Sequence, residues 1–301
     1  MVTTLTLSLG ANMALFSKLW DDIPYTNANN DTGSLASPTT GEALVIRLDH
    51  EPGYVAQTYT GGSSRKIAFY PNQVAIADGE VCCKFGKAQQ TPGATITGWG
   101  VVMRASGNAS SLNCYVATRY GNSLRLAKYL SGTATELTTD LNKGESFWNS
   151  DHFIKLRCNG TTIQAKAWAA GTPEPATWDQ TATDNSLSIG QTGIWSFLSP
   201  LNIKFGQLHW STAGEALPPM EFVISGNVFE AGTPNVPLVR KVRVVRRANG
   251  GRIFKEIESL SDGTFSVIVP SSDPYTVYVL DDISGSYNAL IADRIAPLPL
   301  I

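Results

Sequence analysis

The sequence has 301 residues, of which 43% are hydrophobic and 16% are charged, and its formal net charge is −2. This hydrophobic share excludes a disordered chain, and the length suits two domains that each bury a core of their own. The small negative charge argues against general nucleic-acid binding, and no apolar run reaches the roughly 20 residues needed to span a bilayer. We therefore expect neither nucleic-acid binding nor membrane insertion.

Residues 1–39 predict an N-terminal arm with one strand and one short helix. Leu5, Leu7 and Leu9 alternate with Thr and Ser side chains, as in a half-buried strand. Asn12–Trp20 predicts about two helical turns, with Asn12 as a possible cap. Two interpretations stay open, namely a first strand of the larger domain and a partner-binding arm. The residues expected at such an interface are Leu5, Leu7, Leu9, Phe16 and Trp20.

Residues 40–215 predict a long series of short strands separated by turns. The main predicted strands are Ala43–Leu48, Ile67–Tyr70, Glu80–Phe85, Gly98–Ala105, Asn113–Arg119, Leu124–Leu130, Phe153–Asn159, Thr162–Ala169, Gly193–Phe197 and Ile203–Trp210. Asn159-Gly160 is the strongest hairpin signal of the chain. So many strands without a convincing helix predict an all-β sandwich of two large sheets.

Several segments of this region have the layout of one known fold. They are Gly98–Arg104, Asn113–Val116, Phe153–Gly160, Ile163–Trp168, Gly190–Trp195 and Phe205–Leu208. In order and composition they resemble the concanavalin-A-like jelly roll, the fold of laminin-G modules, legume lectins and many glucanases. The resemblance implies this fold for residues 40–215. It selects no function, because lectins, enzymes and structural modules share the fold.

The two prolines of Ala216–Pro219 predict a short, semi-rigid linker over 216–219. Residues 220–301 then predict a small antiparallel sandwich. Its predicted strands are Glu221–Val228, Arg240–Arg247, Arg252–Ser259, Gly263–Val269, Tyr275–Leu280 and Tyr287–Asp293. Within the second of them, Val242 and Val244 alternate with Lys241, Arg243 and Val245, which indicates one apolar face and one mostly basic, solvated face.

The C-terminal region also resembles a known module. The segments that carry the resemblance are Ile224–Gly226, Val242–Arg247, Ser261–Phe265, Pro274–Val277, Leu280–Asp282 and Tyr287–Pro297. They look like the small immunoglobulin-like module, related to the carboxypeptidase regulatory domain, that recurs at the C-termini of tailed-bacteriophage virion proteins. The run NALIADRIAP at Asn288–Pro297 is the most specific part.

This second resemblance implies a structural component of a tailed-phage virion, at the tail, baseplate or tail tip. Its partners would be other virion proteins and further copies of itself in the particle. The N-terminus lacks the basic and apolar regions of a signal peptide, which fits assembly in the host cytoplasm. The alternative function is a carbohydrate-binding protein that recognises a host receptor, and a glycoside hydrolase is less expected.

Two segments have the composition of a glycan site, because sugar rings stack on aromatic faces and polar side chains bind their hydroxyl groups. The candidate residues are Trp148, Asn149, Asp151, Trp178 and Asp179. The alternative interpretation is that both tryptophans fill gaps in the core. Four further tryptophans lie at strand positions and are predicted to be core residues: Trp99, Trp168, Trp195 and Trp210.

We nominate no catalytic residue, metal or cofactor. Glycosidases of this fold place alternating carboxylates on one strand, and no predicted strand has such a run. Asp49 and Glu51 are two residues apart but read as a solvated turn. The four cysteines and three histidines lack the spacing of a metal site, so reduced, buried thiols are expected. The protein is therefore predicted not to be an enzyme.

Overall fold

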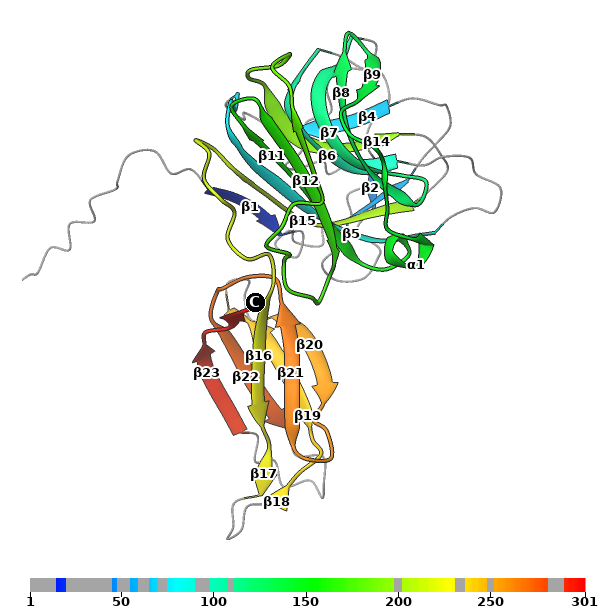
Figure 1. Ribbon diagram of the computed structural model, residues 1–301. Coiled ribbons are helices and arrows are strands. Elements are labelled where there is room, and N and C mark those ends of the chain that lie inside the picture. Colours follow the sequence, from blue (N-terminus) through cyan, green and yellow to red (C-terminus); the bar gives the residue numbers. More distant parts are fainter. Residues whose placement is uncertain are drawn as a thin grey trace, which may run out of the picture. The chain divides into compact units, whose positions relative to one another are not determined.

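The computed structural model describes residues 15–19, 45–47, 55–58, 65–69, 75–89, 98–107, 111–197, 202–230, 236–247, 252–280 and 290–300. The chain divides into two compact units, and both consist of antiparallel β-strands (Figure 1). The first contains Met1–Ala170 and Pro175–Leu217, and the second contains Gly171–Glu174 and Pro218–Ile301. The prediction of an all-β sandwich protein is confirmed.

The units part between Leu217 and Pro218, within the predicted 216–219 linker. No strand runs through this segment, because one strand ends at Ser211 and the next begins at Phe222. The sequence placed Gly171–Glu174 in the first domain, but this loop belongs to the second unit. There the Gly171 N–H donates a hydrogen bond of 2.6 Å to Glu221 Oε2.

The first unit contains an eight-stranded sheet with the order β13-β12-β11-β5-β15-β3-β2, and β1 also pairs with β15. Its strands are β1 (Leu15–Leu19), β2 (Val45–Arg47), β3 (Val55–Thr58), β5 (Gly79–Gln89), β11 (His152–Asn159), β12 (Thr162–Ala169), β13 (Gln180–Thr183) and β15 (Asn202–Ser211). The predicted hairpin between β11 and β12 is present, but it turns at Gly160-Thr161, one residue later than predicted, because Asn159 still pairs with Thr162. Gly160 has a φ of 57°, which glycine adopts without strain.

The opposing sheet has seven strands, in the order β10-β8-β7-β6-β14-β4, and β9 also pairs with β8. Its strands are β4 (Arg65–Phe69), β6 (Gly98–Ser106), β7 (Asn113–Tyr120), β8 (Ser123–Leu130), β9 (Thr133–Glu136), β10 (Leu141–Asn142) and β14 (Gln191–Phe197). A single turn of helix, α1 (Glu145–Trp148), stands between β10 and β11.

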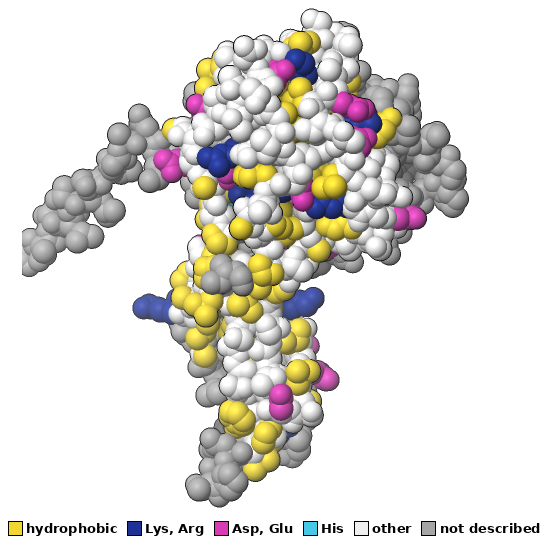
Figure 2. All heavy atoms as spheres, viewed as in Figure 1, with side chains coloured by type: hydrophobic (Ala, Val, Ile, Leu, Met, Phe, Trp, Pro, Cys, Tyr) yellow, Lys and Arg dark blue, Asp and Glu magenta, His cyan; other side chains and the backbone are white. Residues whose placement is uncertain are grey.

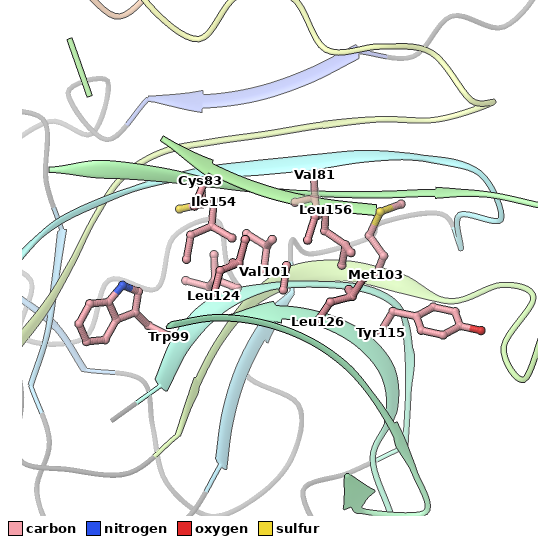
Figure 3. Close-up of a cluster of buried hydrophobic side chains, with 14 of the residues drawn as sticks. Val81, Cys83, Trp99, Val101, Met103, Tyr115, Leu124, Leu126, Ile154 and Leu156 are labelled. Carbon is pink, nitrogen blue, oxygen red and sulfur yellow. The ribbon is translucent and has the colours of Figure 1, made fainter. Parts of the chain in front are cut away.

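The two sheets share one apolar core. Figure 3 shows Val81, Ile154 and Leu156 of the eight-stranded sheet pointing toward the facing sheet. Val101 and Leu126 of that facing sheet belong to the same cluster, and all five side chains are fully buried. Burial of such side chains removes apolar surface from water and is the main stabilising contribution to the unit.

The outer faces of these sheets are also covered. On the seven-stranded sheet a second buried cluster contains Val102, Val116 and Trp195. The Trp195 ring packs so closely over Gly98 that a Cβ added there would lie 2.8 Å from it. On the eight-stranded sheet the outward-pointing Phe153 and Trp168 stack with ring centroids 5.0 Å apart. Burial on both faces explains why all four strand tryptophans are buried, as predicted.

Arg104 ties several segments of the first unit together. It has a φ of 52°, unusual for a residue other than glycine, at an irregularity of β6. Its guanidinium donates hydrogen bonds to the carbonyls of Ala77 (2.6 Å), Leu187 (2.7 Å) and Gly160 (2.8 Å). It also forms an ion pair of 3.0 Å with Asp78. Since only 2% of Arg104 is exposed, these acceptors replace its hydration.

Residues 15–19 correct the prediction of a helix over Asn12–Trp20. They form β1, which pairs antiparallel with β15, so that Phe16 stands opposite Trp210. Pairing with an available strand edge satisfies the backbone of β1 and overrides a weak local helix preference. This part of the arm is therefore a strand of its own sandwich, whereas Leu5, Leu7, Leu9 and Trp20 lie outside the described residues.

The second unit packs a three-stranded sheet, β21-β16-β24, against a four-stranded sheet, β20-β19-β22-β23, with a separate ribbon of β17 and β18. The strands are β16 (Phe222–Asn227), β17 (Phe229–Glu230), β18 (Val236–Pro237), β19 (Lys241–Arg246), β20 (Arg252–Glu258), β21 (Thr264–Val269), β22 (Tyr275–Leu280), β23 (Leu290–Ile295) and β24 (Leu298–Pro299).

The predicted alternation of β19 is confirmed from Lys241 to Val244 but not at Val245, which is buried after an irregularity in the pairing with β20. Val242 and Val244 are fully buried in the core between the two sheets. Arg243 lies on the other face and forms an ion pair of 2.7 Å with Glu256 on β20. Arg246, which follows an irregularity of the strand, pairs with Asp273 at 2.6 Å. The basic stretch is therefore interspersed with acidic side chains.

Candidate functional site

The two predicted glycan segments meet at one end of the eight-stranded sheet. Asp151 directly precedes β11, and its carbonyl accepts a hydrogen bond of 2.9 Å from the N–H of Ala170, just after β12. Asp179 directly precedes β13, and its Oδ2 accepts a hydrogen bond of 2.9 Å from the N–H of Ala167 on β12. Because β11 and β12 run antiparallel, both segments reach the same end of the sheet.

Lys143 connects the two segments through its side chain. Its Nζ forms an ion pair of 2.6 Å with Asp179 Oδ2 and lies 5.9 Å from the ring centroid of Phe147 in α1. The Asp179 carboxylate is thus held by a backbone N–H and an ammonium group. A carboxylate in this arrangement can accept further hydrogen bonds but is oriented by its two partners.

Trp178 is the half-buried aromatic residue of this end of the sheet. Lys166 Nζ lies 4.7 Å from its ring centroid and donates a hydrogen bond of 2.6 Å to the carbonyl of Pro175. This cation–π contact fixes the indole ring while part of its surface stays exposed. Asn149 and Asp151 are also half-buried, so they have partial access to solvent.

Trp148 does not fit its predicted role in glycan binding. Its side chain is fully buried and belongs to the main core cluster. The indole contacts Phe147 and His152 edge to face, with ring centroids 4.7 Å and 4.9 Å away. No face of the ring is available for a sugar, so the alternative interpretation of a hydrophobic plug is the correct one. The short helix α1 turns this side chain inward.

His152 is a buried residue of this region that the sequence did not single out. Its Nε2 accepts a hydrogen bond of 3.2 Å from Trp99 Nε1, and its Nδ1 donates one of 2.7 Å to the carbonyl of Ser150. Burial lowers the pKa of His152 to about 4, and the nearby Arg119 acts in the same direction. The ring is therefore neutral at pH 7 and positions Trp99 beside α1.

The described residues contain no group of three or more His, Cys, Asp or Glu side chains arranged to hold a metal ion. All four cysteines are buried thiols outside any disulfide, as expected. Burial raises the pKa of Cys158 to about 12, so this thiol is not a reactive thiolate. Asp49 and Glu51 lie outside the described residues, so the predicted absence of a carboxylate pair at that place stays a prediction.

Charge is dispersed over the described surface. On the face shown in Figure 2, the Lys and Arg side chains stand singly or beside acidic side chains, without a continuous basic area. Within the described ranges, no helix has the length and apolar character required to cross a bilayer.

Comparisons with known proteins identify no family. No family model matches the chain, and a search of curated proteins found no match either. A carbohydrate-binding module, CBM66 from Bacillus subtilis, has 12% sequence identity and a TM-score of 0.39, over 51% of this chain and 92% of its own. A Bacillus licheniformis β-glucanase has 13% identity and a TM-score of 0.44, over 65% of this chain and 97% of its own.

A third similar structure is the exoplasmic/lumenal domain of VIP36, in a form bound to Ca2+ and Man3GlcNAc. It has 15% identity and a TM-score of 0.39, over 56% of this chain and 84% of its own. All three TM-scores are below 0.5 and all identities are below 25%, so the likeness assigns neither a fold family nor an activity to this chain.

Proposed function

We propose that this chain is a non-catalytic carbohydrate-binding protein whose glycan site contains Trp178, Asp179, Asn149 and Asp151. The observation that carries the proposal is the meeting of two distant segments at one end of the eight-stranded sheet. One segment supplies the partly exposed indole ring of Trp178, and both supply half-buried polar side chains. A shallow aromatic surface with nearby amide and carboxylate groups suits a sugar ring and its hydroxyls.

The fold supports this proposal at a general level. Two large antiparallel sheets over a single core fit the concanavalin-A-like jelly roll that the sequence resembles. The second unit, with its three-stranded and four-stranded sheets, fits the immunoglobulin-like module in the same way. Under this proposal the first unit binds glycan and the second serves as a spacer or docking module.

A glycan array probed with the full chain tests the site. Trp178→Ala removes the ring and is expected to weaken binding of any positive glycan roughly 3- to 10-fold, the usual range for an aromatic contact. Tyr278→Ala is the matched control, because it removes a half-buried aromatic ring from β22 of the second unit. Equal binding by both variants, or no glycan bound by the wild type, would contradict the proposal.

Absence of catalysis is a separate part of the proposal. Single changes at Asp49, Glu51 and Asp151 to the corresponding amides are expected to leave any glycan degradation by the purified protein unchanged. The assay is the release of reducing ends from the glycans that bind on the array. Loss of such an activity in any of the three variants, with binding on the array unchanged, would show that a catalytic carboxylate exists.

The second candidate function is a structural component of a tailed-phage virion, with other virion proteins and further copies of this chain as partners. It rests on the run Asn288–Pro297, part of which forms β23 beside β22 in the second unit. Mass spectrometry of purified particles tests it directly. Removal of residues 1–14, which spares β1, is expected to leave both units folded and to abolish incorporation. Normal incorporation of the shortened chain would contradict a partner role for Leu5, Leu7 and Leu9.

A further inference from the structure

Three arginines on β6, β7 and β8 of the seven-stranded sheet differ in their partners. Arg104 on β6 has three carbonyls and the Asp78 carboxylate. Arg125 on β8 donates two hydrogen bonds, from Nε (2.9 Å) and Nη2 (2.7 Å), to the Asp140 carboxylate. Arg119 on β7 is 1% exposed, yet within the described residues it forms no ion pair with a carboxylate. A buried guanidinium without a directly paired carboxylate is costly, so its surroundings need an explanation.

Aromatic rings surround the Arg119 guanidinium. Its central carbon lies 4.3 Å from the ring centroid of Trp99 and 5.9 Å from that of Trp148. Nε donates a hydrogen bond of 2.7 Å to the carbonyl of Gly121, whereas the buried Nη1 has no hydrogen-bond partner. Burial lowers the pKa of Arg119 to about 10, which the charge of Glu145 partly offsets. The side chain therefore remains a cation at pH 7.

Trp148 supplies a second buried donor in the same cluster. Its Nε1 is buried and has no hydrogen-bond partner. The neighbouring His152 offers it no acceptor, since Trp99 occupies its Nε2 and its Nδ1 donates to the carbonyl of Ser150. Two N–H groups, one of them charged, thus lie in one buried cluster without an acceptor. Buried donors of this kind are rare in folded proteins because each costs the full loss of its hydration.

We propose that Arg119 and Trp148 bind a small carboxylate anion at this end of the core. A carboxylate brings two acceptor oxygens and one negative charge, which match one neutral donor and one cationic donor. Its source is either a free carboxylate of acetate size or the carboxylate of an acidic sugar. The proposal is independent of glycan binding at Trp178.

Helix α1, which covers this site, has low local stability. Helix α1 has only four residues, and its N-cap, Gly144, provides no side-chain hydrogen bond. Helices this short have little stability of their own, so local opening costs less than unfolding of the sandwich. An anion reaches Arg119 when this turn opens, and Trp148 closes over it again.

Thermal unfolding of the full chain tests the proposal. At equal ionic strength, sodium acetate is expected to raise the Tm of the first unit above its value in sodium chloride. The expected rise is about 2–4 °C at a concentration roughly four times the Kd. Sodium glucuronate and glucose form the second pair of probes. A rise in glucuronate but not in acetate assigns the site to an acidic sugar, whereas a rise in both assigns it to carboxylates in general.

Three variants separate this site from general salt effects. Arg119→Gln is expected to abolish the carboxylate-dependent rise in Tm, and Trp148→Phe, which keeps an aromatic ring but removes the N–H, to reduce it. Arg125→Gln is the matched control and is expected to keep the full rise. If Arg119→Gln does not fold, Trp148→Phe decides the question. The proposal is wrong if the wild type shows no rise with either carboxylate, or if Trp148→Phe and Arg125→Gln respond equally.

Discussion

The two units bury their strands in different ways. In the first unit, eight of the nine residues of β6 are buried, because both faces of its sheet are covered. In the second unit, β19 alternates over its first four residues: Val242 and Val244 are buried, whereas Lys241 and Arg243 are half-exposed, and only the last two residues, Val245 and Arg246, break the pattern. Side-chain direction alone therefore predicts burial over Lys241–Val244 of β19 but not over β6.

Both units bury charged side chains, Glu221 and Arg246 in the second, but the first buries more of them. The first unit buries Arg104, Glu80 and Lys155 among strands that are covered on both faces. Glu80 forms an ion pair of 2.8 Å with Lys155 and also accepts a hydrogen bond of 2.9 Å from the N–H of Leu217. A sheet covered on both faces gives polar side chains no route to water, so their stability depends on internal partners. Loss of one partner should consequently cost more in the first unit than in the second.

The largest expected effect is at Arg104. Replacement by Met leaves the Asp78 carboxylate and three carbonyls without their shared donor, and we expect a loss of about 3–5 kcal/mol in the free energy of unfolding of the first unit. Urea denaturation with separate probes for the two units measures this loss. A cost below 1 kcal/mol would show that water replaces the guanidinium. The loss of a buried partner would then not be more costly in the first unit than in the second.

Between pH 7.5 and pH 5, acid should destabilise the first unit more than the second. Burial lowers the pKa of His152 and of His209 to about 4, whereas in the unfolded chain each titrates near 6.5. The unfolded state thus binds more protons, so the stability is complete above pH 6.5 and is lost as the pH falls toward 4. At pH 5 we expect a loss of about 2 kcal/mol per histidine.

Urea denaturation at pH 7.5, 6 and 5 measures this dependence. All three histidines of the chain lie in the first unit, so the second unit has none to titrate and serves as an internal control. An equally steep decrease in the stability of the second unit over this range would point to another titrating group and contradict the assignment.

A change in the apolar core of the second unit should have a smaller effect. Val244→Ala removes two buried carbon atoms from the centre of β19, and we expect a loss of about 1.5 kcal/mol, confined to the transition of the second unit. Differential scanning calorimetry of the full chain resolves the two transitions. A parallel decrease in the Tm of the first unit would show that the two cores do not unfold separately.

The smallest expected effect is at Arg243. Its ion pair with Glu256 lies on the solvated face of the second unit, so Arg243→Met should cost only about 0.2–1 kcal/mol. The same urea assay applies, and added salt should reduce the difference further. If Arg243→Met lowered the free energy of unfolding as much as Arg104→Met, the face of β19 that carries Arg243 would have to be covered, like the faces of the sheets in the first unit.

Much of the strand layout follows from short-range chemistry. The strands β7, β8, β11 and β12 lie within one or two residues of their predicted bounds. Alternating or continuous apolar runs bounded by Gly, Asn and Ser turns specify them locally. The turn at Gly160 is the clearest case, because a φ of 57° is a property of a few adjacent residues. The linker was likewise predicted from local chemistry, because it depends on the paired prolines after Leu217.

The candidate site was predictable only in part. Trp178 and Asp179 have the composition of a sugar site, and the structure leaves Trp178 half-buried. Trp148 has the same composition around it, yet α1 turns it into the core. The difference depends on which neighbours cover each indole ring, and these come from strands distant in the sequence.

Contacts between residues distant in the sequence decided the secondary structure and burial that the local pattern did not specify. Leu15–Leu19 became a strand because β15 offered an edge, although nearby residues favoured a helix. Arg119 entered the core because Trp99 and Trp148, 20 positions before it and 29 after it, pack around its guanidinium. Strand order, the covering of a sheet's second face and the burial of a charge all depend on such contacts, which no local sequence period encodes.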